Sequence, residues 1–128
     1  MATMRCPCLS GNGYDECCGV YHHGEAKAPT AERLMRSRYS AFAVGDARYL
    51  LASWHPRTRP VTLELDPEQR WTRLDIVRTQ RGGMLDTEGI VEFVAYSRVG
   101  GERREQREVS RFVRQDAAWY YLDAITPT

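Results

Sequence analysis

Apolar side chains between residues 30 and 54 recur at the three- and four-residue spacing of helices. One stripe occupies a single helical face and consists of Ala31, Leu34, Met35, Arg38 and Phe42. Thr30 can cap the start of this helix, and Gly45 can end it in a left-handed conformation. Asp46 can cap a second helix that runs to Trp54, since the following Pro56 stops helical geometry. The pattern therefore predicts two consecutive helices.

From residue 71 onward the pattern changes to the β-branched and aromatic composition of strands. Four strands are expected, over residues 71–80, 90–99, 103–114 and 118–125. The pairs Gly82-Gly83 and Gly100-Gly101 supply turns between them, and the proline-containing segment 56–69 is expected to be a loop. Two helices followed by an antiparallel meander predict an α+β fold, with the helices packed on one face of a curved sheet.

Arg38 is the charged member of the otherwise apolar helical stripe. Arginine on a core-facing stripe is costly unless it is paired. The side chain therefore lies either at the edge of the stripe, with its charged head in water, or in a polar cavity. The edge position is the more common arrangement.

All four cysteines of the 128 residues lie in one short segment with the spacing C-x-C-x8-C-C: Cys6, Cys8, Cys17 and Cys18. Four thiolates make the closed tetrahedral shell of a structural zinc site. The segment Ser10-Gly11-Asn12-Gly13 tolerates tight turns and can fold the second pair back toward the first. A helical turn beginning at Asp15 would leave the last two thiols only about 100° apart. The spacing therefore predicts one structural Zn²⁺ bound by these four residues.

Other chemistries of the cluster fit the sequence less well. Disulfides need an oxidising compartment, whereas residues 1–8 lack the apolar stretch of a secretory signal. A bridge between the neighbours Cys17 and Cys18 would also be strained. An iron–sulfur cluster is chemically possible, although this spacing is not a usual ferredoxin run, and oxidation of the thiolates could make the site a redox switch. Reduced thiols predict a cytoplasmic protein. Residues 20–29 are expected to be a linker, with His22 and His23 solvated or around the metal and not bound to it.

Residues 5–19 resemble the SEC-C motif, a zinc knuckle at the C-terminus of the bacterial protein-translocation motor. The fourth ligand of that motif is often histidine, where this chain has Cys18, and the motif commonly has glycine where this chain has Leu9. Segments 28–42, 111–114 and 119–121 resemble the YchJ-like family of bacterial proteins. The two resemblances together cover nearly the whole chain.

The resemblance implies a knuckle and linker over residues 1–24 and an α+β domain over residues 25–128. It also implies that this domain has a cone-shaped, nuclear-transport-factor-two-like fold. Because the SEC-C motif of the motor binds an export chaperone and ribosomes, the resemblance implies a protein partner in export or translation. It implies no reaction.

The charge pattern does not predict nucleic acid as a partner. The net charge is +1, and six arginines between Arg98 and Arg114 alternate with Glu102, Glu105 and Glu108. Opposite charges facing each other across strands are ordinary on an exposed sheet. No apolar run approaches the roughly 18 residues that a membrane-spanning helix needs.

Cone-shaped folds often enclose a pocket, and some relatives resemble isomerases and dehydratases that use a His–Asp pair. The residues that could line such a pocket are Arg38, Tyr39, Asp46, Trp54, His55, Glu92 and Tyr96. No catalytic motif such as G-x-S-x-G or H-E-x-x-H is present. The sequence therefore favours a zinc-binding interaction or adaptor protein over an enzyme. The alternative is a small-molecule-binding protein or enzyme that uses the pocket.

Overall fold

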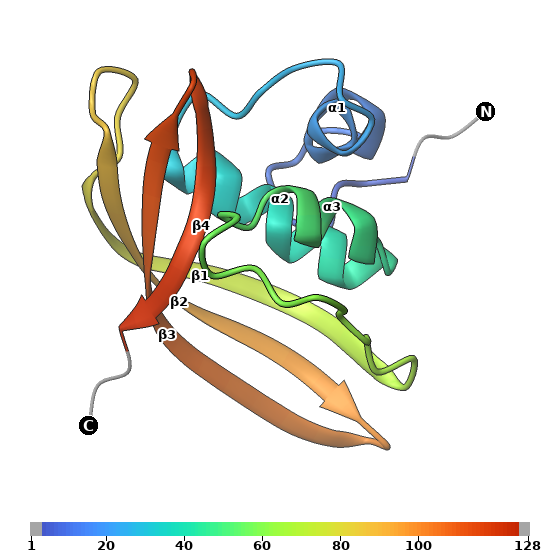
Figure 1. Cartoon of the computed structure of the whole chain (residues 1–128). Coiled ribbons are helices and arrows are strands. Elements are labelled where there is room, and N and C mark those ends of the chain that lie inside the picture. Colours follow the sequence, from blue (N-terminus) through green and yellow to red (C-terminus); the bar gives the residue numbers. More distant parts are fainter. Residues whose placement is uncertain (1–3, 126–128) are drawn as a thin grey trace.

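The computed structural model describes residues 4–125, which form a curved antiparallel sheet with helices on one of its faces (Figure 1). The four strands pair in chain order: β1 (Gln69–Arg81), β2 (Glu88–Val99), β3 (Glu102–Gln115) and β4 (Ala118–Ile125). The helices are η1 (Tyr14–Glu16), α1 (Cys18–His22), α2 (Ala31–Val44) and α3 (Ala47–Ala52). The predicted α+β fold is confirmed.

The caps of α2 and α3 are the predicted ones. The backbone N–H of Arg33 donates to Thr30 Oγ1 over 3.1 Å, and that of Tyr49 donates to Asp46 Oδ1 over 3.0 Å. Gly45 ends α2 at a φ of +78°. However, α3 ends at Ala52 and not at Trp54, because the chain turns there to pair with β4.

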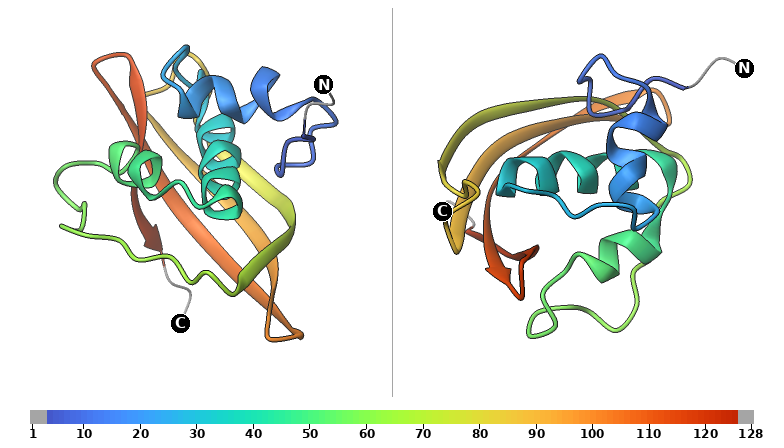
Figure 2. Two further views of the ribbon diagram at one scale, coloured as in Figure 1. Left: turned by 90° about the vertical axis from the view of Figure 1, so that its right-hand side faces the viewer. Right: turned by 90° about the horizontal axis from the view of Figure 1, so that it is seen from above.

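The core lies between α2 and the concave face of the sheet (Figure 2). Alternate residues of β2 point into it and are buried: Gly89, Val91, Phe93, Ala95 and Ser97. From α2, Leu34, Met35 and Tyr39 pack against this face. Register shifts in β1 and in the β3–β4 pair interrupt the regular ladder, and such irregularities bend and twist strands. The described helices lie on the concave side of this curved sheet (Figure 2).

The N-terminal knuckle, defined here as residues 4–24, lies beside α2 (Figure 1). An antiparallel bridge between Arg5 and Gly13 closes its first loop. Contacts of α2 with the sheet, with α3 and with α1 connect the knuckle to the core. The expectation that residues 20–29 form a linker is wrong for their first part, since α1 continues to His22.

Candidate metal centre

The four cysteine sulfur atoms converge in one buried cluster. All lie within 4.8 Å of one another, and all four residues are free thiols with at most 7% of their surface exposed. A tetrahedral zinc–thiolate site with Zn–S bonds of 2.3 Å would place its sulfurs about 3.8 Å apart. Cys8 Sγ and Cys17 Sγ are already 3.6 Å apart. The cluster therefore has the dimensions to bind one metal ion.

Backbone hydrogen bonds in the first loop position Cys6 and Cys8. The N–H of Cys6 donates to Asn12 O over 3.0 Å, and the N–H of Leu9 donates to Cys6 O over 3.1 Å. Leu9 has a φ of +65°, in the left-handed region that favours glycine. This geometry explains why the SEC-C motif commonly has glycine at this position. The Leu9 side chain is 60% exposed, so it lies outside the buried cluster of cysteines.

Cys17 and Cys18 do not share one helix, contrary to expectation. Cys17 lies between η1 and α1 with φ −122° and ψ −109°, and Cys18 is the first residue of α1. A continuous helix would fix the angle between the two adjacent side chains. Because the helix is broken at Cys17, the backbone angles of Cys17 can direct both sulfurs toward the same point.

Crowding of the thiols shifts their ionisation in opposite directions. A hydrogen bond from Cys18 lowers the pKa of Cys6, and the same contact raises the pKa of Cys18. Each further thiolate in such a cluster is opposed by the charges already present and by burial. A divalent cation held by these four residues would remove this opposition and would allow all four sulfurs to be deprotonated.

Side chains from α2 and from the first loop surround the sulfur atoms. The hydroxyl of Ser40 lies 3.6 Å from Cys6 Sγ, and that of Ser10 lies 3.2 Å from Cys17 Sγ. Arg36 Nη1 donates to Cys8 O over 3.2 Å. Such outer partners orient metal ligands and adjust their basicity. The sequence pattern did not identify Ser40 or Arg36, because they are some thirty residues away along the chain.

His22 joins the knuckle to α2. Its Nε2 donates to Ser37 O over 2.7 Å, since a backbone carbonyl can only accept. In the neutral imidazole, Nδ1 then accepts from the hydroxyl of Tyr14. The ring also packs against Tyr49, with 4.5 Å between the ring centroids. His22 is therefore partly buried between knuckle and helices, whereas its neighbour His23 is exposed.

The variant His22→Ala is expected to lower the free energy of unfolding by about 1–3 kcal/mol, because it removes two hydrogen bonds and leaves Tyr14 unpaired. Urea denaturation measures this change, and amide exchange of residues 14–22 locates it. The matched control is His23→Ala, which should change stability by less than about 0.5 kcal/mol. Equal effects of the two variants would contradict the joining role of His22.

Three of the seven predicted pocket residues line one common cavity on the concave side of the sheet. Arg38, Tyr39 and Trp54 form part of its wall. Arg38 is buried, with 4% of its surface exposed, so the edge position that is more common for such arginines does not apply.

The other four predicted residues, Asp46, His55, Glu92 and Tyr96, lie outside this cavity. Asp46 caps α3. His55 Nε2 donates to Gln115 Oε1 over 2.9 Å, and its Nδ1 accepts from a backbone N–H, so both ring nitrogens are occupied. Glu92 and Tyr96 alternate with the buried residues of β2 and face the other side of the sheet.

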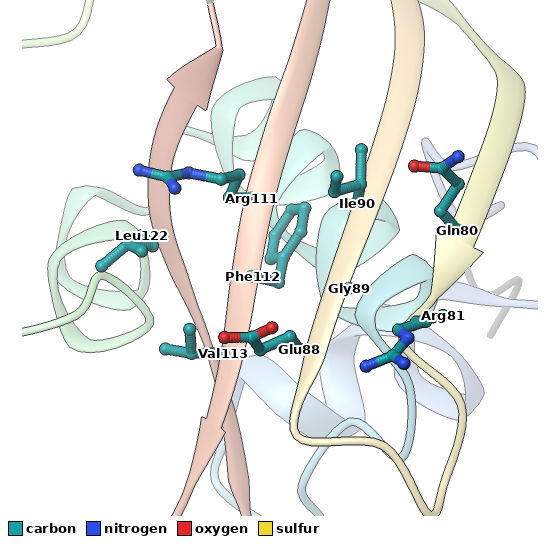
Figure 3. A pocket seen from close by; sticks show the side chains of 9 residues that line it. All are labelled: Gln80, Arg81, Glu88, Gly89, Ile90, Arg111, Phe112, Val113 and Leu122. Carbon is teal, nitrogen blue, oxygen red and sulfur yellow. The ribbon is translucent and has the colours of Figure 1, made fainter.

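Ion pairs dominate the helix-free face of the sheet. Glu92 binds Arg78 over 2.7 Å and Arg107 over 2.9 Å, and Arg111 pairs with Asp123. These pairs lower the pKa of both carboxylates. A hollow of about 530 Å³ lies near Ile90 and Arg111 (Figure 3), and it contains none of the predicted pocket residues. Among the described residues, Arg78, Arg107 and Arg111 of this face thus pair with Glu92 and Asp123, and not with the interleaved Glu102, Glu105 and Glu108.

Comparison with known proteins extends over nearly the whole chain. The family described as "YchJ, middle NTF2-like domain" matches residues 30–124. A UPF0225 protein of Streptomyces coelicolor is 54% identical over 123 residues, covering 96% of each chain, and one of Chromobacterium violaceum is 48% identical over 97% of this chain and 94% of its own.

Two solved structures resemble the fold. A SEC-C motif containing protein from Rhodopseudomonas palustris has a TM-score of 0.83 and 31% identity over 98% of this chain and 100% of its own. One from Psychrobacter arcticus has a TM-score of 0.75 and 28% identity over 96% of this chain and 84% of its own. None of the described helices of the present chain is long and apolar enough to cross a membrane.

Proposed function

This chain belongs to the YchJ-like family, and on that premise we propose that it is a cytoplasmic zinc-binding interaction protein. The cluster of four buried cysteine sulfurs, all free and all within 4.8 Å of one another, carries the proposal. Zinc is the metal of choice for four thiolates in a closed structural site. A reducing compartment keeps the thiols available for it.

The knuckle is the proposed docking element. It is too small to build a core of its own, since the cysteines and the partly buried Tyr14 make up its apolar cluster. Metal binding therefore supplies the order that a docking surface requires. Two apolar side chains project from it, with Met4 54% and Leu9 60% exposed. The partner we propose is an export chaperone or the ribosome, as the resemblance to the SEC-C motif implies.

Co-sedimentation with purified ribosomes and capture by a purified export chaperone test the proposal. Wild-type protein is expected to bind one of these partners, while Leu9→Asp should bind at least about tenfold more weakly, because it places a charge on the apolar docking face without removing a ligand. The control is Leu85→Asp, on the β1–β2 loop where Leu85 is 94% exposed, and it should bind like wild type. Equal binding by Leu9→Asp and Leu85→Asp, or no binding to either partner, would reject the docking role.

A further inference from the structure

The cavity on the concave side of the sheet has aromatic walls. Its volume is about 290 Å³, at the small end of the range for ligand pockets. Six aromatic side chains line it, from α2, from the segment after α3 and from the sheet: Tyr39, Phe42, Trp54, Trp71, Phe93 and Tyr121. Aromatic surfaces of this kind bind a flat apolar body. The size of the cavity restricts that body to a small molecule.

Arg38 places a positive charge in this wall without an anion in direct contact. Its Nη1 donates to Leu50 O over 2.8 Å and to Ser53 Oγ over 2.7 Å, both neutral acceptors. The five ion pairs among residues 4–125 do not include it. Burial lowers the pKa of Arg38 to about 10, so the guanidinium is still charged at neutral pH. A buried cation normally has a directly bound counter-charge, and within residues 4–125 Arg38 has none, since Glu108 acts on it only across the cavity, without an ion pair.

Two aromatic rings pack against the guanidinium group of Arg38. Its guanidinium carbon lies 4.5 Å from the centroid of Tyr121 and 5.1 Å from that of Trp54. A guanidinium has five N–H donors. Within residues 4–125, Arg38 has two hydrogen-bond acceptors, and both receive their hydrogen bonds from Nη1, so Nε and Nη2 donate to neither. The indole N–H of Trp54 is also buried with no acceptor in the described part of the chain. Arg38 therefore brings N–H donors to the cavity wall for which the described part of the chain supplies no acceptor.

Glu108 supplies a negative charge to the same cavity. Its Oε2 accepts from the hydroxyl of Ser110 over 2.7 Å, and it forms no ion pair within residues 4–125. Burial raises the pKa of Tyr39 and of Tyr121 to about 12, so both phenols are neutral at pH 7. Arg38 and Glu108 are thus the charged side chains that line the cavity, one of each sign and not paired with each other.

We infer that this cavity binds a small zwitterion with an aromatic body, the chemistry of a free aromatic amino acid. Its carboxylate would pair with the free donors of Arg38, which suit the planar, two-oxygen geometry of a carboxylate. Its ammonium group would pair with Glu108 and with the faces of the surrounding rings. A simple anion would meet repulsion from Glu108, and a simple cation would meet repulsion from Arg38. A zwitterion satisfies both charges.

The three tryptophans of the chain allow a direct binding test by NMR of the ¹⁵N-labelled, full-length protein. Trp54 and Trp71 line the cavity, whereas Trp119 does not, and its indole N–H donates to Pro29 O over 3.1 Å. L-phenylalanine is expected to shift the indole signals of Trp54 and Trp71 saturably and to leave that of Trp119 unchanged. Phenylacetate and phenethylamine, which each lack one charge, should bind at least about tenfold more weakly. The inference is overturned by unchanged Trp54 and Trp71 signals, or by equal affinity for all three compounds.

Two matched variants test the charge assignment. Glu108→Gln keeps the size of the side chain. It is expected to weaken the binding of L-phenylalanine about tenfold without weakening the binding of phenylacetate. Glu105→Gln is the control. Glu105 is exposed and lies opposite Tyr96 in the β2–β3 register, on the helix-free face of the sheet. Arg38→Lys should weaken the binding of both phenylalanine and phenylacetate. If that variant does not fold, the Glu108 comparison decides, and an unchanged phenylalanine affinity in Glu108→Gln rejects the inference.

Discussion

Removal of the proposed zinc ion is expected to unfold the N-terminal knuckle and to leave the sheet folded. The knuckle packs around four sulfur atoms, and without a cation these sulfurs either repel one another as thiolates or take up protons, so they no longer hold the two loops together. The stabilisation at stake is large, on the order of 10 kcal/mol for structural zinc in small domains. Amide hydrogen exchange with and without a chelator should therefore show loss of protection in residues 4–24 and retained protection in β2 and β3. Native mass spectrometry identifies the ion and its stoichiometry in the same samples.

Cys17→Ser provides the internal control for this prediction. The variant should resemble chelated wild type, and chelator should change it little further, because the site is already incomplete. A purified, reduced wild-type protein that carries no metal, yet protects residues 4–24 as strongly as the sheet, would contradict the predicted zinc site.

The second large effect is expected from Gly89→Ala at the base of the β1–β2 hairpin. A Cβ on Gly89 would lie 2.5 Å from the Cα of Gly82 and 3.0 Å from the Cβ of Ala31. The first of these is a backbone atom in a buried turn, and Gly82 O also accepts the N–H of Ala31 over 2.9 Å, at the start of α2. The chain has little freedom to move away. We expect a loss of about 2–3 kcal/mol in the free energy of unfolding, as for other overpacked sites.

Urea denaturation of Gly89→Ala beside Gly83→Ala measures this effect. Gly83 lies in the same hairpin, and a Cβ there would meet the end of the Asp86 side chain at 3.3 Å and no backbone atom. Gly83→Ala should therefore change stability by less than about 1 kcal/mol. A Gly89→Ala protein as stable as Gly83→Ala would show that the junction between hairpin and α2 is not tightly packed.

The candidate metal site shows how far spacing alone could lead. Four cysteines within thirteen positions were enough to predict their convergence, because a short chain with a glycine-containing turn cannot separate them far. The break between η1 and α1 and the contacts of His22 and Ser40 were not predictable. The contacts of His22 and Ser40 depend on α2 lying against the knuckle, and no local pattern in residues 4–24 encodes that.

The predicted pocket shows where alternation fails. Along β2 both faces carry apolar residues, with Val91 and Phe93 on one and Ile90 and Val94 on the other. The sequence therefore does not tell which face is covered by α2. Glu92 and Tyr96, which the sequence offers as candidate pocket residues, face away from the cavity. For Arg38 the sequence leaves a different question open. Its position on the helical stripe does not say whether the guanidinium lies in water or in a cavity.

The sequence by itself determined the helices, the strands and the grouping of the cysteines, because these follow from capping, periodicity and short-range chain geometry. The tertiary structure alone decided which sheet face is interior, how α2 supports the knuckle, and that Arg38 and Glu108 share one aromatic cavity. These features arise between segments distant along the chain. The interaction energies between these segments depend on how deeply the side chains are buried and on how far apart their charges lie. Both are set only once the curved sheet and the helices have packed together.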